Sequence, residues 1–242
     1  MSDLKTILVT GKEELLGYSD QIRRLFEDCF STSMSIDLWH WAYIDNPFGN
    51  PIVTMTVDDR QLVGHYAVVP YFLTNGKNEK IKSALSMTTM VAESHRKHYL
   101  FTKLAEETYS EMNRQEYDIV CGFPNLQSVS GFRKRLGWEI GEPDFVASVT
   151  KEQLINSQDL KSFLSDQKRF GFDCADKVNI DWRLEKPGFD YVIDNGNILK
   201  KFSAGYDLMS VEENSIVNLS DDRKYNVLFD KSVRDLLEFK DL

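Results

Sequence analysis

Cysteine is scarce in this chain, and its spacing excludes two kinds of stabilising site. The 242 residues contain 3 cysteines, Cys29, Cys121 and Cys174, and no two of them form a CxxC pair. Isolated cysteines in odd number support neither a disulfide framework nor a structural zinc site. His95 and His98 lie three residues apart, but no further set of ligands completes a metal site, so we expect no metal. Free thiols are typical of a reducing cytoplasm.

Long hydrophobic runs and an excess of basic residues are also missing. No apolar run approaches the roughly 18–20 residues that span a bilayer, and the N-terminus lacks a basic-then-apolar signal. We therefore expect a soluble, cytoplasmic protein that does not bind membranes. Lys and Arg number 29 against 38 Asp and Glu, a net charge of −9. Because proteins that bind nucleic acid usually carry the opposite sign, we expect no nucleic-acid partner.

The chain has enough apolar material for a packed core. Apolar residues make up 42% of the sequence and aromatic residues 12%, which predicts a globular protein. A length of 242 residues suits one large domain, or one domain with a partial second. Residues 151–170 are polar and resemble a linker. We therefore expect one domain at 1–150, followed by a linker and a partial second domain at 151–242.

The spacing of apolar residues predicts a mixture of strands and helices in the first 150 residues. The expected strands are 4–9, 52–57, 62–73, 81–92, 118–123 and 138–150, and the expected helices are 22–29, 35–43, 96–114 and 126–136. This order predicts an α/β fold. The segment Trp182–Pro187 also echoes Trp41–Pro47, which indicates a weak internal repeat.

The junction near residue 96 has the features of an anion site. A strand ends there, a turn follows, and a helix begins, with Arg96 and Lys97 in the turn. Free backbone N–H groups and the positive end of the helix dipole favour phosphate at such a junction. Any strand–turn–helix has the same local geometry, so the junction alone leaves an ordinary structural turn as the alternative.

Short motifs between residues 15 and 148 resemble those of the GNAT superfamily of acyl-CoA-dependent N-acetyltransferases. They are Asn46-Pro-Phe-Gly49, Leu62-Val-Gly-His65, Met90-Val-Ala-Glu-Ser-His-Arg96, Leu100-Phe-Thr-Lys-Leu104, Cys121-Gly-Phe-Pro-Asn125 and Gly131-Phe-Arg-Lys-Arg-Leu-Gly-Trp138. The set is similar to a bacterial branch with an appended, partial second GNAT-like domain. The resemblance implies a GNAT-like mixed central sheet flanked by helices, with a smaller β-rich C-terminal region.

The resemblance also implies a co-substrate, acetyl-CoA or another acyl-CoA, and the residues that would hold it. The strand ending at Met90 and Val91 would bind the pantetheine arm along its edge. Asn125 would lie near the co-substrate, where the family often has a polar residue. The pyrophosphate would be held by the turn and the start of the helix, which comprise Arg96, Lys97, His98, Tyr99, Leu100 and Phe101.

Three positions depart from the family pattern. Tyr99 and Phe101 stand where the phosphate loop of the family has Gly and Gly or Ala. Glycine allows the backbone to approach a phosphate without a Cβ in the way, so Tyr99 could close the site or point outward. Phe132 is the position nearest to a Tyr that many family members use as general acid, and Phe has no proton to give.

Catalysis would require removal of a proton from the acceptor ammonium and stabilisation of charge on the thioester oxygen. We take Glu93 and His65 as candidate bases, directly or through water, and Asn125 as a further candidate catalytic residue. Each base has a structural alternative: Glu93 as a carboxylate at a helix N-terminus, and His65 as a hydrogen-bonded core residue. Cys121 stands in an apolar strand and is expected to be a structural thiol.

The sequence therefore favours an N-acyltransferase that transfers an acyl group to a small amine, with an amino sugar suggested only by the family branch. The departures at Tyr99, Phe101 and Phe132 leave a second reading, a non-catalytic GNAT-like scaffold that binds acyl-CoA or a protein. A third reading is an aminoacyl transferase similar to the tandem-GNAT Fem family. Unpaired strand edges in a partial second domain also predict a homodimer through the C-terminal region.

Overall fold

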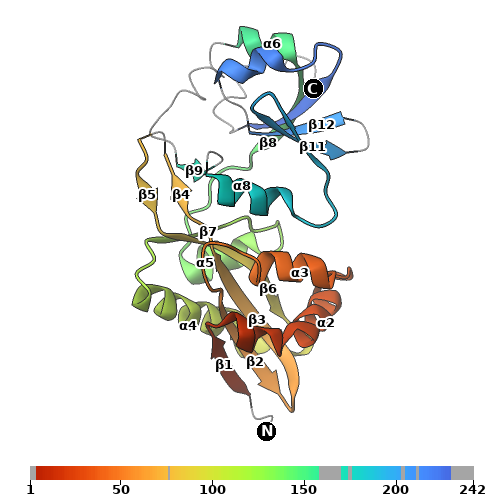
Figure 1. The fold of residues 1–242 in the computed structure, drawn as a ribbon. Helices are drawn as coiled ribbons and strands as arrows, with labels where there is room; N and C mark the ends of the chain where they lie inside the picture. Colours follow the sequence, from red (N-terminus) through yellow and green to blue (C-terminus); the bar gives the residue numbers. More distant parts are fainter. Residues whose placement is uncertain are drawn as a thin grey trace. The chain divides into compact units, whose positions relative to one another are not determined.

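The computed structural model describes residues 4–75, 77–157, 170–173, 176–202, 205–210 and 213–229. The chain divides into two compact units. Unit 1 comprises Met1–Ile140 and Phe170–Pro187, and unit 2 comprises Gly141–Arg169 and Gly188–Leu242. Both units contain a five-stranded sheet (Figure 1). No helix among the described residues is long and apolar enough to cross a membrane.

The sheet of unit 1 is mixed, with its only parallel pair at one end. Its strands follow the order β1 (Lys5–Val9), β2 (Ile52–Asp58), β3 (Gln61–Pro70), β6 (Ser83–Val91) and β7 (Ile119–Gly122). The first three neighbouring pairs are antiparallel, and β6 and β7 are parallel. Since β3 is buried along nearly its whole length, helices must cover both faces of the sheet.

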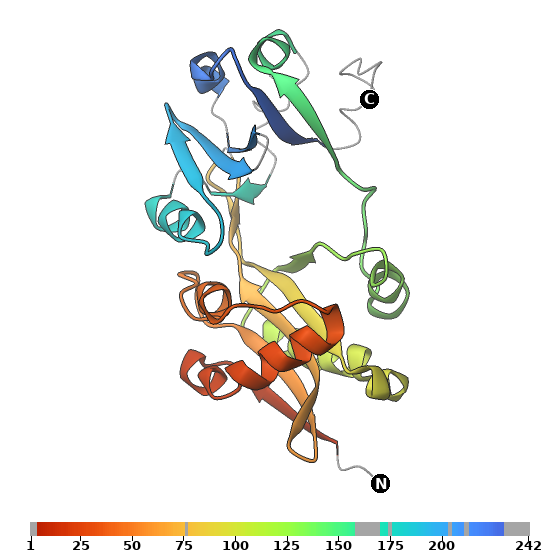
Figure 2. The same cartoon turned by 90° about the vertical axis from the view of Figure 1, so that its right-hand side faces the viewer.

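Helices cover the two faces of this sheet as two layers (Figure 2). One layer consists of α1 (Lys12–Leu16), α2 (Ser19–Phe30) and α3 (Ile36–Tyr43), and the other of α4 (Leu100–Arg114) and α5 (Val129–Leu136). The Ser35 side chain accepts a hydrogen bond from the Leu38 N–H and so fixes the start of α3. Gly64 lets α4 approach, because a Cβ there would lie 2.9 Å from Leu104 Cδ1.

The segment 170–187 returns to unit 1 and packs against α3. Its strand β9 (Gly171–Phe172) joins β4 (Leu73–Thr74) and β5 (Lys80–Ile81) in a small antiparallel sheet, and its helix is α8 (Lys177–Leu184). The indoles of Trp41 and Trp182 stack with centroids 4.6 Å apart and an interplanar angle of 5°. Each indole N–H donates to the backbone carbonyl of the other residue, at 2.7 and 3.0 Å.

Unit 2 has a second mixed sheet with its own core. The strands follow the order β10 (Tyr191–Asp194), β11 (Asn197–Phe202), β12 (Gly205–Ser210), β13 (Lys224–Phe229) and β8 (Phe145–Thr150). The short helices α6 (Lys151–Asn156) and η2 (Glu213–Asn218) complete the described part of this unit. Leu154, Leu199 and Tyr225 are among the side chains buried in its core.

The α/β fold class predicted from the sequence is confirmed, with local differences in the elements. The helix expected at 96–114 begins as a 3-10 helix, η1 (Glu93–His98), and continues as α4 after Tyr99, whose left-handed backbone interrupts the helix. The strand expected at 62–73 ends at Pro70, and the one expected at 138–150 begins at Phe145.

The two units also differ from the division expected at residue 150. Strand β8 pairs with β13 over six positions and so belongs to unit 2, whereas 170–187 belongs to unit 1. Cys29 and Cys121 are free thiols, and Cys174 lies outside the described residues.

Candidate active site

A pocket opens in unit 1 where the two parallel strands separate. Strands β6 and β7 pair from Ser83 with Ile119 to Ser86 with Gly122, but β6 continues to Val91 without β7 beside it. The pocket at this divergence has a volume of about 620 Å³. Its lining comes from β6, the segment after β7, helix α5 and the C-terminal end of α2, together with Arg96 of η1 and Phe101 of α4.

A β-bulge shapes the β6 wall of the pocket. Ala67 of β3 pairs with Met87, and His65 pairs with Met90, so Thr88 and Thr89 together lie opposite one residue, Tyr66. Thr88 has φ 48, a left-handed value in the middle of a strand. Extra residues on one strand bend it and re-aim its side chains.

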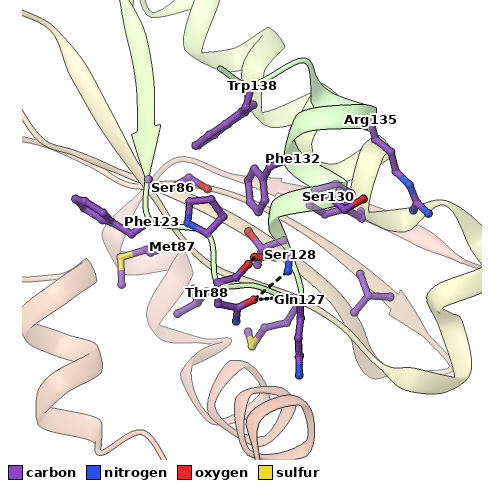
Figure 3. Close-up of a pocket in the computed structure, with 18 of the residues that line it drawn as sticks. Ser86, Met87, Thr88, Phe123, Gln127, Ser128, Ser130, Phe132, Arg135 and Trp138 are labelled. Atoms are coloured by element: carbon purple, nitrogen blue, oxygen red, sulfur yellow. Dashed lines mark hydrogen bonds between the residues drawn. The ribbon is translucent and has the colours of Figure 1, made fainter. Parts of the chain in front are cut away.

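Helix α5 and the residues after it form the facing wall (Figure 3). Ser86 and Met87 lie on the β6 side of the view, and Phe132 and Arg135 lie on the α5 side. Phe132 is almost fully buried, and its ring meets that of Trp138 with centroids 4.7 Å apart. Gly122 leaves room for this indole, because a Cβ at 122 would lie 3.1 Å from Trp138 Cη2.

Hydrogen bonds fix the aromatic base of the pocket. The Trp138 Nε1–H donates to the Tyr109 hydroxyl at 2.8 Å, and the hydroxyls of Tyr109 and Tyr66 are 2.6 Å apart. Ser86 Oγ donates to the Tyr66 hydroxyl at 3.1 Å. Burial raises the pKa of both tyrosines, which therefore stay neutral at physiological pH. The chain of hydroxyls ties β6, α4 and the segment after α5 to one another.

The charges that line the pocket are positive. Arg96, Lys134 and Arg135 are the ionised lining residues, and all three are exposed. Among the residues that the structure describes, the lining contains no carboxylate, imidazole or tyrosine hydroxyl. Its remaining titratable group is the Cys29 thiol, whose pKa burial raises and whose Sγ lies 3.6 Å from the Val91 carbonyl oxygen. The pocket is therefore suited to hold an anion.

Sequence and structure comparisons identify the family. A model of the acetyltransferase (GNAT) domain matches residues 16–141, just over half of the 242 residues. The chain belongs to the GNAT family. The resemblance to the GNAT superfamily is therefore confirmed, whereas the appended second GNAT-like domain stays a prediction. No curated protein matches the chain in sequence.

Two solved structures are similar in fold to almost the whole chain. A GCN5-related N-acetyltransferase from Kribbella flavida has a TM-score of 0.60 at 12% identity, covering 97% of this chain and 67% of that one. A conserved protein of unknown function from Enterococcus faecalis V583, described as a probable N-acyltransferase, has a TM-score of 0.57 at 9% identity, covering 93% and 65%. The chain thus spans about two thirds of the length of each. At these identities the likeness shows the fold alone.

Five of the nine residues predicted to hold the co-substrate line the pocket. They are Met90, Val91, Arg96, Phe101 and Asn125. The Asn125 side chain caps the turn before α5, because its Oδ1 accepts the N–H groups of residues 127 and 128 at 3.1 and 3.0 Å. This use of Oδ1 in a local turn gives Asn125 a structural role besides any contact with a ligand.

The next four predicted residues lie outside the pocket lining: Lys97, His98, Tyr99 and Leu100. Leu100 is 3% exposed and packs in the core under α4, whereas the Tyr99 side chain is 75% exposed. Tyr99 therefore takes the second of the two orientations considered from the sequence, with the ring pointing outward. Its φ of 54 is the left-handed conformation that glycine adopts readily.

Neither candidate base lines the pocket. Glu93 is exposed and begins η1. His65 is fully buried, its Nδ1 lies 2.8 Å from the Thr88 carbonyl oxygen, and burial lowers its pKa to about 4. A neutral imidazole with Nδ1–H donating to a carbonyl is the arrangement of a structural core histidine.

Lys134, Arg135 and Trp138 belong to the motif Gly131–Trp138, whereas sequence reasoning missed the other pocket residues from α2, from the turn before α5 and from its first turn, namely Cys29, Phe30, Gln127, Ser128 and Ser130. Helical spacing marks Cys29 as facing inward, but it carries no signal that the end of α2 reaches the divergence of two later strands. Among the described residues, no group of three His, Cys, Asp or Glu side chains could hold a metal ion.

Proposed function

We propose that the chain is an acyl-CoA-dependent N-acyltransferase that uses acetyl-CoA and a small amine. Membership of the GNAT family supports acyl transfer. The observation that carries the proposal is the pocket itself, an open length of β6 beyond Ser86 with Arg96, Lys134 and Arg135 around it. An extended chain of amides can add to a free strand edge, and cationic side chains suit a pyrophosphate.

The residues present fit an acyl-CoA whose pantetheine arm lies along β6 and whose phosphates lie near the cationic side chains. Met90 and Val91 would lie along the pantetheine arm, and Arg96 would lie beside the phosphates. When bound, acyl-CoA would supply an activated thioester. The protein would hold the amine and the thioester in one pocket, and such positioning alone removes several kcal/mol from a reaction barrier, about 7–11 in the best cases.

The described part of the lining supplies no carboxylate or imidazole to act as a base, so the proton of the acceptor ammonium would pass to water in the pocket. The same observation favours one alternative, a GNAT-like protein that binds acyl-CoA without transferring the acyl group. An amino sugar stays the suggested acceptor because of the family branch, and the homodimer stays a prediction for the C-terminal region.

Calorimetric titration with acetyl-CoA and with CoA tests the co-substrate. We expect binding in the micromolar range, about −8 kcal/mol. Arg135→Ala should weaken binding roughly fivefold, the effect of losing an exposed contact worth about 1 kcal/mol. Arg133→Ala is the matched control, since Arg133 lies on the same helix but donates to the Ile140 carbonyl at 3.3 Å and does not line the pocket.

Release of the CoA thiol in the presence of a panel of amines then separates the two readings. Amine-dependent release establishes transfer, whereas tight binding with no release for any amine supports the non-catalytic alternative. Absence of binding to the wild-type protein would overturn both.

A further inference from the structure

The bulge at Thr88 puts a β-branched residue into a backbone conformation that such residues rarely adopt. Its φ of 48 lies in the left-handed region, where the Cβ of a threonine crowds the backbone. Such a conformation persists only where the surrounding structure over-determines it. Thr88 also lines the pocket, so whatever holds it there acts on the wall of the candidate active site.

Two buried side chains hold Thr88 from different layers of unit 1. From the neighbouring strand β3, the His65 Nδ1–H donates to the Thr88 carbonyl oxygen at 2.8 Å. From helix α3, the Tyr43 hydroxyl is hydrogen-bonded to Thr88 Oγ1. His65 and Tyr43 are both 0% exposed, and their rings meet edge to face with centroids 6.4 Å apart. We call these two residues the Thr88 clamp.

In the described part of the protein, the His65 imidazole makes one hydrogen bond, the one to Thr88. Its Nε2 is buried without a hydrogen-bonding partner, and it does not reach the pocket lining. Burial keeps the ring neutral, which fixes the proton on Nδ1 because the Thr88 carbonyl can only accept. A polar ring in the core with one nitrogen unsatisfied is unfavourable. The hydrogen bond to the Thr88 carbonyl therefore accounts for the presence of a histidine at position 65.

The clamp matters for the pocket because side chains along a strand alternate between its faces. A change of one residue in the bulge would move every later side chain of β6 to the opposite face. After the bulge, Met90 packs in the core beneath α2 and α3, while Val91 packs against the core beneath α4. Both residues line the pocket, so their placement depends on where the bulge lies.

We propose that Tyr43 and His65 are positioning residues for acyl transfer: they hold Thr88 in its left-handed conformation and thereby set the register of the β6 segment that lines the acyl-CoA pocket. This inference rests on the proposed function. Neither side chain lines the pocket, so both act through Thr88.

Substitutions at His65 separate positioning from stability. His65→Leu removes the donor, whereas His65→Asn places an amide N–H close to the position of Nδ1. We expect His65→Leu to lower kcat/KM for acetyl-CoA about tenfold and to speed amide hydrogen exchange in the peptide covering residues 86–91. His65→Asn should stay within about twofold of the wild type in both measurements.

Thr54→Val is the matched control for a buried hydrogen bond lost elsewhere in the same sheet. Thr54 Oγ1 lies 2.8 Å from Thr108 Oγ1, both residues are 0% exposed, and neither lines the pocket. This variant should lower the melting temperature and leave kcat/KM and exchange at 86–91 unchanged. If His65→Leu behaved like Thr54→Val, with a lower melting temperature but wild-type kcat/KM and exchange, the inference would be overturned.

A milder variant covers the case in which His65→Leu does not fold. Tyr43→Phe removes only the hydroxyl, and we expect a roughly threefold loss of kcat/KM with faster exchange at 86–91. Unchanged values for Tyr43→Phe would overturn the role of Tyr43. If the wild type does not bind acetyl-CoA, the proposed function fails, and exchange at 86–91 in His65→Leu against His65→Asn still decides whether the clamp fixes β6.

Discussion

The two sheets contain the same run of four strands. In unit 1 the run is β2-β3-β6-β7 and in unit 2 it is β10-β11-β12-β13, and in both the pairs are antiparallel, antiparallel and parallel. The first hairpin of each run turns through two residues with positive φ, Asp59 and Arg60 in one and Asn195 and Gly196 in the other. These features favour the internal repeat suggested by the two Trp-containing segments, which stays a prediction.

The runs differ at the parallel pair. In unit 1 the connection from β6 to β7 contains the 15-residue helix α4, and β7 pairs with β6 alone. In unit 2 the described part of the connection is η2, and β13 also pairs with β8 over six positions. In both runs the third strand continues past its parallel partner, because β12 pairs with β13 at two positions and β6 pairs with β7 at four. The difference lies at the outer edge of the fourth strand, where β13 pairs with β8 and β7 has no further strand in the described sheet.

The bulges in the two runs differ as well. In each run the third strand carries extra residues opposite the second, at Thr88 and Thr89 in β6 and at Met209 in β12. Only Thr88 among these has a positive φ, and only in unit 1 do the described residues include buried side chains bonded to the bulge. A bulge alone is therefore a property of this strand arrangement, whereas a clamped bulge distinguishes the unit with the pocket.

The largest effect is expected from cavities in the two cores. Leu104 lies on the buried side of α4 and Leu199 lies in the core of unit 2, and each side chain is no more than 2% exposed. Leu104→Ala and Leu199→Ala should each lower the free energy of unfolding by about 2–5 kcal/mol. Leu104→Ala should also weaken acetyl-CoA binding, because α4 carries Phe101 to the pocket. Leu199→Ala should leave it unchanged. Thermal melts and calorimetry check both, and equal losses of affinity would contradict the functional contrast between the sheets.

Acid should destabilise unit 1 through His65. The pKa of His65 is about 4 in the folded state against 6.5 for the ordinary side chain, so the unfolded chain binds more protons between these values. Stability is therefore fully present above pH 6.5 and falls as the pH drops toward 4, by about 3 kcal/mol for this side chain.

Urea unfolding at several pH values, for the wild type and for His65→Asn, measures this contribution. The wild type should lose more stability than the variant between pH 6.5 and 4. The same dependence of the free energy of unfolding on pH in both proteins would mean that His65 has an ordinary pKa in the folded state and is reached by water. Neither curve depends on acetyl-CoA.

A smaller effect should follow from weakening the Trp41–Trp182 contact. Trp41→Phe keeps an aromatic ring but removes the N–H that donates to the Trp182 carbonyl, at a cost of about 1 kcal/mol. Because this contact ties 170–187 to unit 1, we expect faster proteolysis within that segment and an unchanged rate within 188–229. An unchanged rate at 170–187 would mean that β9, rather than the tryptophan pair, holds the segment.

The sequence predicted most of unit 1 because its signals are local. The capping Ser35, the turn at 58–60 and the apolar spacing of α4 each depend on neighbouring residues, and the GNAT motifs identified the strand and turn at Met90 and Arg96. These signals located one wall of the pocket and the family.

The remainder depends on contacts between residues far apart in the chain. The pairing of β8 with β13 joins residues about 80 positions apart, so no local pattern assigns β8 to unit 2. His65 was proposed as a base because its residue type suits that chemistry, whereas its burial follows from the strands and helices that surround β3. The orientation of Tyr99 likewise follows from the backbone at the start of α4.

Tyr99→Gly is expected to produce the smallest change, and it examines one of the three positions that depart from the expected family pattern. Glycine should raise the free energy of unfolding by up to about 1 kcal/mol, because the left-handed backbone costs a non-glycine residue about 1–2 kcal/mol and the greater freedom of glycine in the unfolded state offsets part of this gain. The ring is 75% exposed and does not line the pocket, so acetyl-CoA affinity should stay within about twofold.

Calorimetry measures the affinity for acetyl-CoA, and thermal melts measure the stability. Markedly tighter binding would show that Tyr99 obstructs the phosphate turn, and markedly weaker binding would show that its ring contacts acetyl-CoA. Either result would place the turn 96–101 among the features that separate unit 1 from unit 2.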